Sequence, residues 1–233
     1  MTPRALPRLA ALVLTAALAG AACAGPGPAD TGTPPALTAL PAPDTLGAAT
    51  LASAISERRS VREYGPGALT LAEVSQLVWV AQGITGADEK HRAVPSAHAV
   101  HPLEVRLEAR RVDGLAPGLY VYRPKEHALA LVAAGSAKEA VMGAAGQPCV
   151  AAAAAVVCVA GDGALAATRF GRNAERWLGM EAGFVVQDVY LTCTSLGLGT
   201  AMVGGYDEEK ANAAFRLAPG WKTLGLLPVG RRK

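Results

Sequence analysis

Arg-Arg-Ser-Val-Arg-Glu-Tyr occupies positions 58–64 of the chain, and Pro-Ser-Ala-His-Ala-Val-His-Pro occupies positions 95–102. Arginine offers forked, charged donors and serine offers a short hydroxyl, so the first stretch suits a phosphate group. A solvated charge run is the alternative interpretation of that stretch taken alone. The second stretch is small and nearly uncharged, which suits a backbone that lies flat against a planar ring. Together the two stretches predict a phosphorylated aromatic cofactor.

The composition limits the class of function. The chain has 233 residues, of which 51% are hydrophobic, so it can bury one substantial core. Its formal net charge is +3, and its arginines are not gathered with aromatic residues into a stripe, which argues against nucleic-acid binding. Cys149, Cys158 and Cys193 lack metal-like CxxC spacing and lie in apolar surroundings, so we expect buried free thiols.

Residues 1–23 have the layout of an export signal. Arg4 and Arg8 precede an apolar run at positions 9–19, which is shorter than the roughly 20 residues of a membrane-spanning helix. Cys23 stands where a bacterial lipoprotein signal places its lipidated cysteine, and ordinary cleavage after an Ala-x-Ala pattern is the alternative. We therefore expect an exported protein, either a periplasmic or extracytoplasmic membrane-anchored lipoprotein or a secreted protein. Residues 24–45 are rich in Pro, Gly and Ala and are expected to tether a globular domain over residues 46–233.

Hydrophobic periodicity predicts mixed helices and strands. Thr70 and Glu73 have the spacing of a capping box at the start of a helix that should end near Gly83. The unbroken apolar run at 150–160 fits a central strand covered on both faces, although a buried helix also fits. Further helices are expected over 48–57, 173–196 and 207–215, and strands over 103–109, 118–123, 128–132, 200–204 and 223–229. Because strands and helices do not alternate strictly, we assign the chain to the α+β class.

The expected helix over 173–196 carries a face shared by Met180, Phe184, Gln187, Leu191 and Thr194.

Several segments, taken in order, resemble a known family. The basic stretch at 58–62 is followed by Leu-Val-Trp-Val-Ala-Gln-Gly-Ile-Thr at 77–85, Pro-Ser-Ala at 95–97 and His-Pro-Leu-Glu-Val at 101–105. This order is similar to that of the flavin-dependent nitroreductase superfamily. The segments at 114–122, 181–188, 197–200 and 228–230 resemble its SagB-type dehydrogenase branch. The resemblance covers nearly the whole expected domain.

The resemblance implies a central antiparallel sheet flanked by helices, in an interlocked homodimer that holds FMN noncovalently at its interface. The phosphate and ribityl cluster would consist of Arg58, Arg59, Ser60 and Arg62, with Arg231 or Arg232 added from the C-terminal end. The flavin ring would lie against Pro95, Ser96 and Ala97, and its other side would be closed by Gly204 and Gly205.

The resemblance also implies that the flavin carries the chemistry, so that no acid–base triad is needed. In the family's usual ping-pong cycle, NADH or NADPH passes a hydride to flavin N5, and an electron-poor acceptor such as a nitroaromatic compound or a quinone then takes it. The peptide-modifying branch instead oxidises azoline rings to azoles. Because NAD(P)H is scarce outside the cytoplasm, a noncatalytic, exported flavin-binding lipoprotein module is a further alternative.

Two positions depart from the family pattern. His98 follows Pro-Ser-Ala where many relatives carry glycine, a residue that serves positive φ or close backbone approach. This histidine is either an exposed loop residue without a role, or a contact of the flavin or the substrate. Asp188 stands where relatives often carry asparagine, and we expect it to cap a backbone group or pair with an arginine. A zinc site of His98, His101 and Glu104 is disfavoured, because Pro102 opposes a helix there.

Overall fold

A seven-stranded sheet forms the centre of the computed structural model, which describes residues 36–47 and 49–233. The strand order is β1-β6-β5-β3-β7-β9-β8, and every pair of neighbours is antiparallel. The expected α+β class with a central antiparallel sheet is confirmed. The strands are β1 (Leu37–Ala39), β3 (Leu103–Ala109), β5 (Gly118–Arg123), β6 (Ala128–Ala134), β7 (Ala155–Asp162), β8 (Leu198–Thr200) and β9 (Trp221–Arg231). A separate parallel pair joins β2 (Leu69–Thr70) to β4 (Val112–Asp113).

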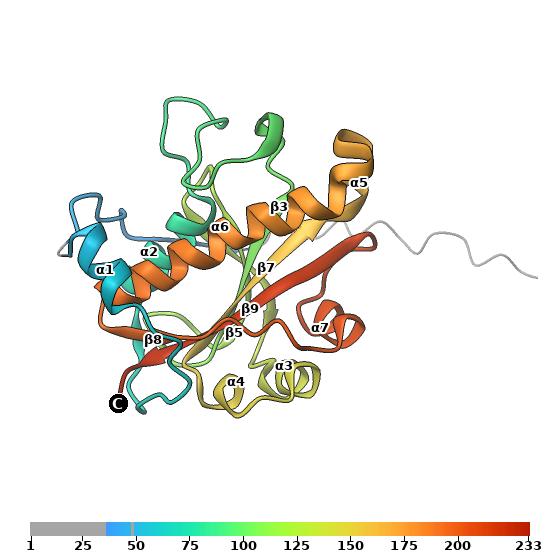
Figure 1. The fold of residues 1–233 in the computed structure, drawn as a ribbon. Coiled ribbons are helices and arrows are strands. Elements are labelled where there is room, and N and C mark those ends of the chain that lie inside the picture. The colour runs from blue at the N-terminus through green and yellow to red at the C-terminus, as the bar shows by residue number, and fades with distance from the viewer. Residues whose placement is uncertain (1–35, 48) are drawn as a thin grey trace, which may run out of the picture. The chain divides into compact units, whose positions relative to one another are not determined.

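Helices cover both faces of the sheet, and Figure 1 shows α6 running across the strands on one of them. That face carries α2 (Leu71–Gln82), α5 (Gly163–Phe170) and α6 (Ala174–Ser195), with α1 (Leu51–Glu57) packed against α6. The other face carries α3 (Lys138–Ala145), α4 (Pro148–Ala152) and α7 (Glu208–Ala214). Along β7, Val157 and Val159 pack on the α6 side, whereas Val156 and Cys158 pack on the other. Because side chains alternate along a strand, a central strand covered on both faces must be apolar throughout.

The apolar run at 150–160 contains parts of two elements. Its first residues complete α4, which has a proline in its first turn, and the rest forms the buried strand β7. The helix and strand interpretations of this run are therefore each correct for one part of it. Cys149, Cys158 and Cys193 are buried free thiols, as expected.

A local signal sets the start of α2. At the start of α2, Glu73 N–H donates to Thr70 Oγ1 at 3.2 Å and Thr70 N–H donates to Glu73 Oε2 at 2.7 Å, so the capping box is confirmed. The long helix α6 is also confirmed. The face shared by Met180 and Phe184 is its outer one, since these side chains are 54% and 44% exposed. The strand expected at 200–204 is instead β8, which ends at Thr200.

The domain begins earlier in the chain than the composition predicted. β1 pairs with β6 at the sheet edge, and Leu40 is buried in the core. The Pro41 carbonyl accepts hydrogen bonds from Ser75 Oγ at 2.5 Å and from His127 Nε2 at 2.9 Å. The prediction that the tether reaches residue 45 and that the domain starts near residue 46 is therefore wrong, because a three-residue edge strand is too short to show a period of two in the sequence.

The expected export signal, the lipidated Cys23 and the tether up to residue 35 lie outside the described residues. Within the described ranges, none of the helices is both long and apolar enough to cross a membrane.

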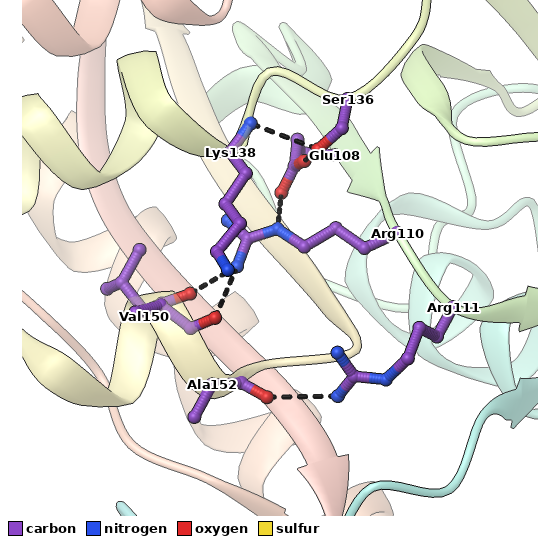
Figure 2. Close-up of polar contacts among 8 residues, drawn as sticks. Glu108, Arg110, Arg111, Ser136, Lys138, Val150 and Ala152 are labelled. Carbon is purple, nitrogen blue, oxygen red and sulfur yellow. Dashed lines mark hydrogen bonds and ion pairs between the residues drawn. The ribbon is translucent and has the colours of Figure 1, made fainter.

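A buried ion pair connects the end of β3 to α4 (Figure 2). Arg110 Nε lies 2.5 Å from Glu108 Oε2, and the two side chains are 5% and 0% exposed. Arg110 Nη1 also donates to the Val150 carbonyl, and Arg111 Nη2 donates to the Ala152 carbonyl at 3.0 Å. The last carbonyls of a helix have no partner within the helix, so these arginines satisfy the end of α4 and fix it to the sheet.

Candidate active site

The basic segment that follows α1 lies flat on the last two strands of the sheet. Val61 N–H donates to the Thr200 carbonyl at 2.9 Å, and Gly65 N–H donates to the Arg231 carbonyl at 2.8 Å. Between them Tyr64 is buried, at 6% exposure. These contacts fix the position of the arginine and serine side chains that leave the end of α1.

Two glycines allow this close approach. A Cβ at Gly199 of β8 would lie 2.7 Å from Val61 Cγ1, and a Cβ at Gly230 of β9 would lie 2.7 Å from Tyr64 Cβ. Carbon atoms that are not bonded do not pack at such distances, so any side chain here would displace the basic segment. Both glycines belong to the segments at 197–200 and 228–230 on which the family resemblance rests.

Tyr190 of α6 links the basic segment to the loop that follows β8. Its hydroxyl oxygen lies 3.1 Å from Ser60 Oγ and accepts a hydrogen bond from Met202 N–H at 2.7 Å. The Arg58 guanidinium carbon lies 5.2 Å from the centroid of the Tyr190 ring, which is a cation–π contact. We call the four residues Arg58, Ser60, Tyr190 and Met202 the Tyr190 junction.

The nearby Arg62 and Arg59 side chains have different contacts. Arg62 is exposed and forms no ion pair with any of the described residues. Arg59 turns back on α1, where its Nη1 donates to the carbonyls of Ser56 and Arg58.

The two C-terminal arginines are also in different environments. Arg231 forms a two-bond ion pair with Glu73 of α2, with N–O distances of 2.6 and 2.8 Å. This pairing satisfies the charge of Arg231 within the protein, which argues against the phosphate contact expected for it. Arg232 is exposed and its Nε donates to the Leu198 carbonyl at 2.9 Å. Arg232 pairs through its backbone with Tyr64, so it lies beside the basic segment.

The loop that contains Pro95, Ser96 and Ala97 has an unusual backbone. His98, Ala99 and His101 all have positive φ, at 54°, 50° and 51°. Such left-handed geometry is uncommon for residues other than glycine and is concentrated at functional sites. The Ser96 hydroxyl accepts a hydrogen bond from His101 N–H at 2.9 Å and closes the loop. His98 thus adopts the conformation for which glycine was expected at its position, with its ring 5.8 Å from that of Trp177.

An apolar hollow lies between this loop and α6. It is lined by Pro95, Ala97, Trp177, Met180, Glu181 and Phe184. Glu181 is only 4% exposed, and its Oε1 has no hydrogen-bond partner among the described residues. Burial raises the pKa of Glu181 to about 7, and hydrogen bonding to Ser96 and the charge of Arg92 act in the opposite direction.

The residues of the candidate site fall into two separate groups along α6, which we call half-sites. The Tyr190 junction and the exposed Gly204 and Gly205, which follow Met202, form one of them. The hollow at Glu181 forms the other. Glu181 and Tyr190 are nine residues apart on α6, which corresponds to about 13 Å along the helix axis. The outer face of α6 exposes Phe184, and the adjoining α1 exposes Leu51, at 67%.

Comparison with known proteins identifies the family. The sequence model of the nitroreductase family matches residues 55–231. The chain belongs to the nitroreductase family. MJ1384 of Methanocaldococcus jannaschii, which carries a nitroreductase name, is 36% identical over 184 residues, covering 78% of this chain and 91% of that protein. The match confirms the family that the ordered segments predicted, and it makes the chain an oxidoreductase of a generally flavin-dependent family.

Solved structures with nitroreductase names share the fold. A protein of Ralstonia eutropha JMP134 superimposes with a TM-score of 0.74 at 23% identity, over 86% of this nitroreductase-family chain and 95% of that one. A protein of Anabaena variabilis ATCC 29413 gives a TM-score of 0.70 at 25% identity, over 78% of this chain and 38% of that one. The chain therefore spans less than half the length of the Anabaena protein.

Two further sequence expectations concern acids in this nitroreductase-family domain. Burial raises the pKa of Asp188 to about 6, and the described residues include no arginine paired with it, contrary to expectation. The side chains considered for zinc have other partners, since His101 Nε2 lies 3.0 Å from the Lys90 carbonyl and Glu104 pairs with Arg106 at 2.6 Å. Residues 36–47 and 49–233 hold no group of three or more potential ligands suited to a metal ion.

Sequence reasoning missed Tyr190 and Glu181. A tyrosine inside a long amphipathic helix gives no signal of its own, because its partners Ser60 and Met202 come from distant segments. Glu181 did give a signal, since it lies on the same helical face as the buried Leu178 and Val185. An acid on a buried helical face is uncommon and marks a candidate site.

Proposed function

We propose that this nitroreductase-family oxidoreductase binds FMN and transfers hydride from NADH or NADPH to an electron-poor aromatic acceptor, such as a nitroaromatic compound or a quinone, in a ping-pong cycle. The observation that carries the proposal is the Tyr190 junction. It holds Arg58 and Ser60 together, next to the exposed Arg62.

The residues present fit the phosphate of FMN. Arg58 lies over an aromatic ring rather than on a carboxylate. Glu63, the acid of the basic segment, pairs instead with Lys233 at 3.1 Å. Confined positive groups repel one another unless an anion neutralises them, so the charge of Arg58 and Arg62 is available to a phosphate. Arg232 is the better placed of the two C-terminal candidates.

The hollow beside Pro95 and Ala97 suits a flat aromatic ring. Trp177 and Phe184 line it with aromatic side chains, and Pro95 and Ala97 of the loop line it as well. We propose that the flavin ring and its two successive substrates lie here, with Gly204 and Gly205 closing the opposite side from the neighbouring half-site.

We further propose a homodimer with FMN at its interface. Each chain presents a phosphate half-site and a ring half-site about 13 Å apart along α6. The outer apolar residues Met180 and Phe184 of α6 and Leu51 of α1 are exposed in the single chain. A second copy packed on this face would cover them and would place the phosphate half-site of one chain near the ring half-site of the other.

FMN, when bound, would supply the acceptance and donation of a hydride at N5. The chain's own residues would bind and orient FMN and its substrates. Arg58, Ser60 and Arg62 would hold the phosphate, and the apolar hollow would exclude water and admit flat acceptors.

An absorption spectrum tests the proposal directly. The purified protein, reconstituted with FMN, should be yellow, bleach with NADH or NADPH without oxygen, and recover its colour with a quinone. Arg62→Ala should weaken FMN binding by about 1.5–3 kcal/mol, roughly 10- to 150-fold, because a charged hydrogen bond is lost. The control Arg123→Ala, at an exposed position at the end of β5, should not change it. Bound flavin that no donor reduces would instead indicate a noncatalytic binding module.

Oxidation of azoline rings in peptides is a second candidate, favoured by the resemblance of the segments at 181–188 and 197–200 to the SagB-type branch. A thiazoline-containing peptide should then bleach the oxidised flavin without any nicotinamide.

We also propose export and lipid attachment at Cys23, on the basis of the basic, apolar and small-residue layout of residues 1–23. Wild-type protein should be recovered in the membrane fraction, and Cys23→Ser should not. Soluble export of both forms would reject the lipid anchor.

A further inference from the structure

We propose that Glu181 holds the proton that accompanies hydride transfer to the acceptor and donates it to the acceptor oxygen. The inference rests on the function proposed above. The proton donor is a side chain of the hollow rather than the cofactor.

The position of Glu181 carries the inference. It is the carboxyl group of a hollow whose other lining residues are Pro95, Ala97, Trp177, Met180 and Phe184. The residue is 4% exposed, and its buried Oε1 has no hydrogen-bond partner in the described part of the chain. An ionised carboxylate in such surroundings is costly, so the group binds a proton at a pH where an exposed glutamate has lost it. Burial accordingly raises its pKa to about 7, which matches the pH at which proton donors work best.

The polar groups around Glu181 keep this proton available. Arg92 acts on it by charge but forms no ion pair with it among the described residues; Arg92 Nη1 instead donates to Gln82 Oε1 at 3.1 Å. Ser96 is the hydroxyl that faces the carboxyl from the loop. Burial and the charge of Arg92 lower the pKa of the neighbouring His101, so that imidazole stays neutral and does not compete as an acid.

The proposed step balances for a quinone acceptor. FMN, when bound and reduced, would supply the hydride that the quinone gains. The O–H bond of Glu181 breaks, and its proton forms a new O–H bond on the quinone, which completes the hydroquinone. The Glu181 carboxylate then takes its next proton from water. An acceptor that takes electrons without protons needs no such donor.

Infrared titration of the flavin-free protein tests the proton-holding role without any activity. A second protonated carboxyl, Asp188, should lose its carbonyl band around pH 6 in every variant tested. The carbonyl band that disappears around pH 7 in wild-type protein should be missing in Glu181→Gln. It should persist in the matched control Glu175→Gln, because that side chain lies on the same helix but is 92% exposed. A Glu181 carboxyl that is already ionised at pH 5 would overturn the proposal.

Two acceptors then separate proton donation from loop positioning in the FMN-loaded protein. In FMN-loaded Glu181→Gln, the rate of reoxidation by a quinone relative to that by ferricyanide, a proton-free one-electron acceptor, should fall on the order of 100-fold at pH 6 and lose its decline above pH 7. Glu181→Asp should restore part of both.

An equal loss of reoxidation rate with quinone and ferricyanide would show that Glu181 only positions the loop. An unchanged rate of reoxidation by the quinone would show that Glu181 donates no proton. Either result, with FMN bound and reduced normally, overturns this inference while the proposed function stands. Wild-type protein that binds no FMN would overturn the proposed function, and with it the donation step.

Discussion

Replacing Tyr190 by phenylalanine tests whether α6 organises the phosphate half-site. The substitution keeps the ring on which Arg58 lies and removes the oxygen that is 3.1 Å from Ser60 Oγ and 2.7 Å from Met202 N. The half-buried Met202 N–H would lose its partner, which should lower the free energy of unfolding by about 1–3 kcal/mol. The Ser60 side chain would lose a hydrogen bond worth about 1 kcal/mol, so FMN should bind roughly fivefold more weakly.

Urea unfolding measures the first effect, and quenching of flavin fluorescence on titration measures the second. Tyr120→Phe is the matched control, because it removes a hydroxyl that donates to the Ala116 carbonyl at 2.8 Å, outside the two half-sites. This control should lose stability and keep the wild-type affinity for FMN. If Tyr190→Phe binds FMN as tightly as Tyr120→Phe does, the Tyr190 junction does not hold the phosphate, and our placement of the cofactor is refuted.

Three further results are expected. Gly230→Ala should weaken FMN binding, as measured by the same titration, because the new Cβ would lie 2.7 Å from Tyr64 Cβ and displace the basic segment; wild-type affinity would show that the segment tolerates the shift. Glu108→Ala should cost about 3–5 kcal/mol in urea unfolding, because it leaves the Arg110 charge buried and unpaired, and a loss under about 1 kcal/mol would contradict this. Because burial raises the pKa of Glu181 from 4.5 to about 7, the folded state holds a proton that the unfolded chain has lost. The contribution of this proton to the free energy of unfolding should be full below pH 4.5 and fall by about 3 kcal/mol as the pH rises to 7. Urea unfolding across that pH range should show a smaller fall in Glu181→Gln than in wild type. An equal fall in the two proteins would exclude the raised pKa of Glu181.

The helices and central strands were predictable because their signals are local. Thr70 and Glu73 cap α2 through residues three apart, and the capping box forms as the sequence predicts. The wholly apolar stretch of β7 likewise reflects its burial on both faces. The order of the segments was enough to identify the nitroreductase family.

The remaining features depend on contacts between distant parts of the chain. Arg231 was expected at a phosphate, but its partner Glu73 is 158 residues away, so no sequence pattern shows that its charge is already paired. The edge strand β1 depends on pairing with β6 rather than on its own three residues. Asp188 is half-buried only because α6 packs against the sheet, which is why its raised pKa could not be anticipated.

The central claim is that the Tyr190 junction and the hollow at Glu181 together hold FMN. The most direct measurement is the visible absorption spectrum of the purified protein after reconstitution with FMN and removal of free flavin. We predict a bound flavin spectrum, about one FMN released per chain on denaturation, and a marked loss of retained flavin in Arg62→Ala. A colourless wild-type protein that releases no FMN after reconstitution would contradict the account.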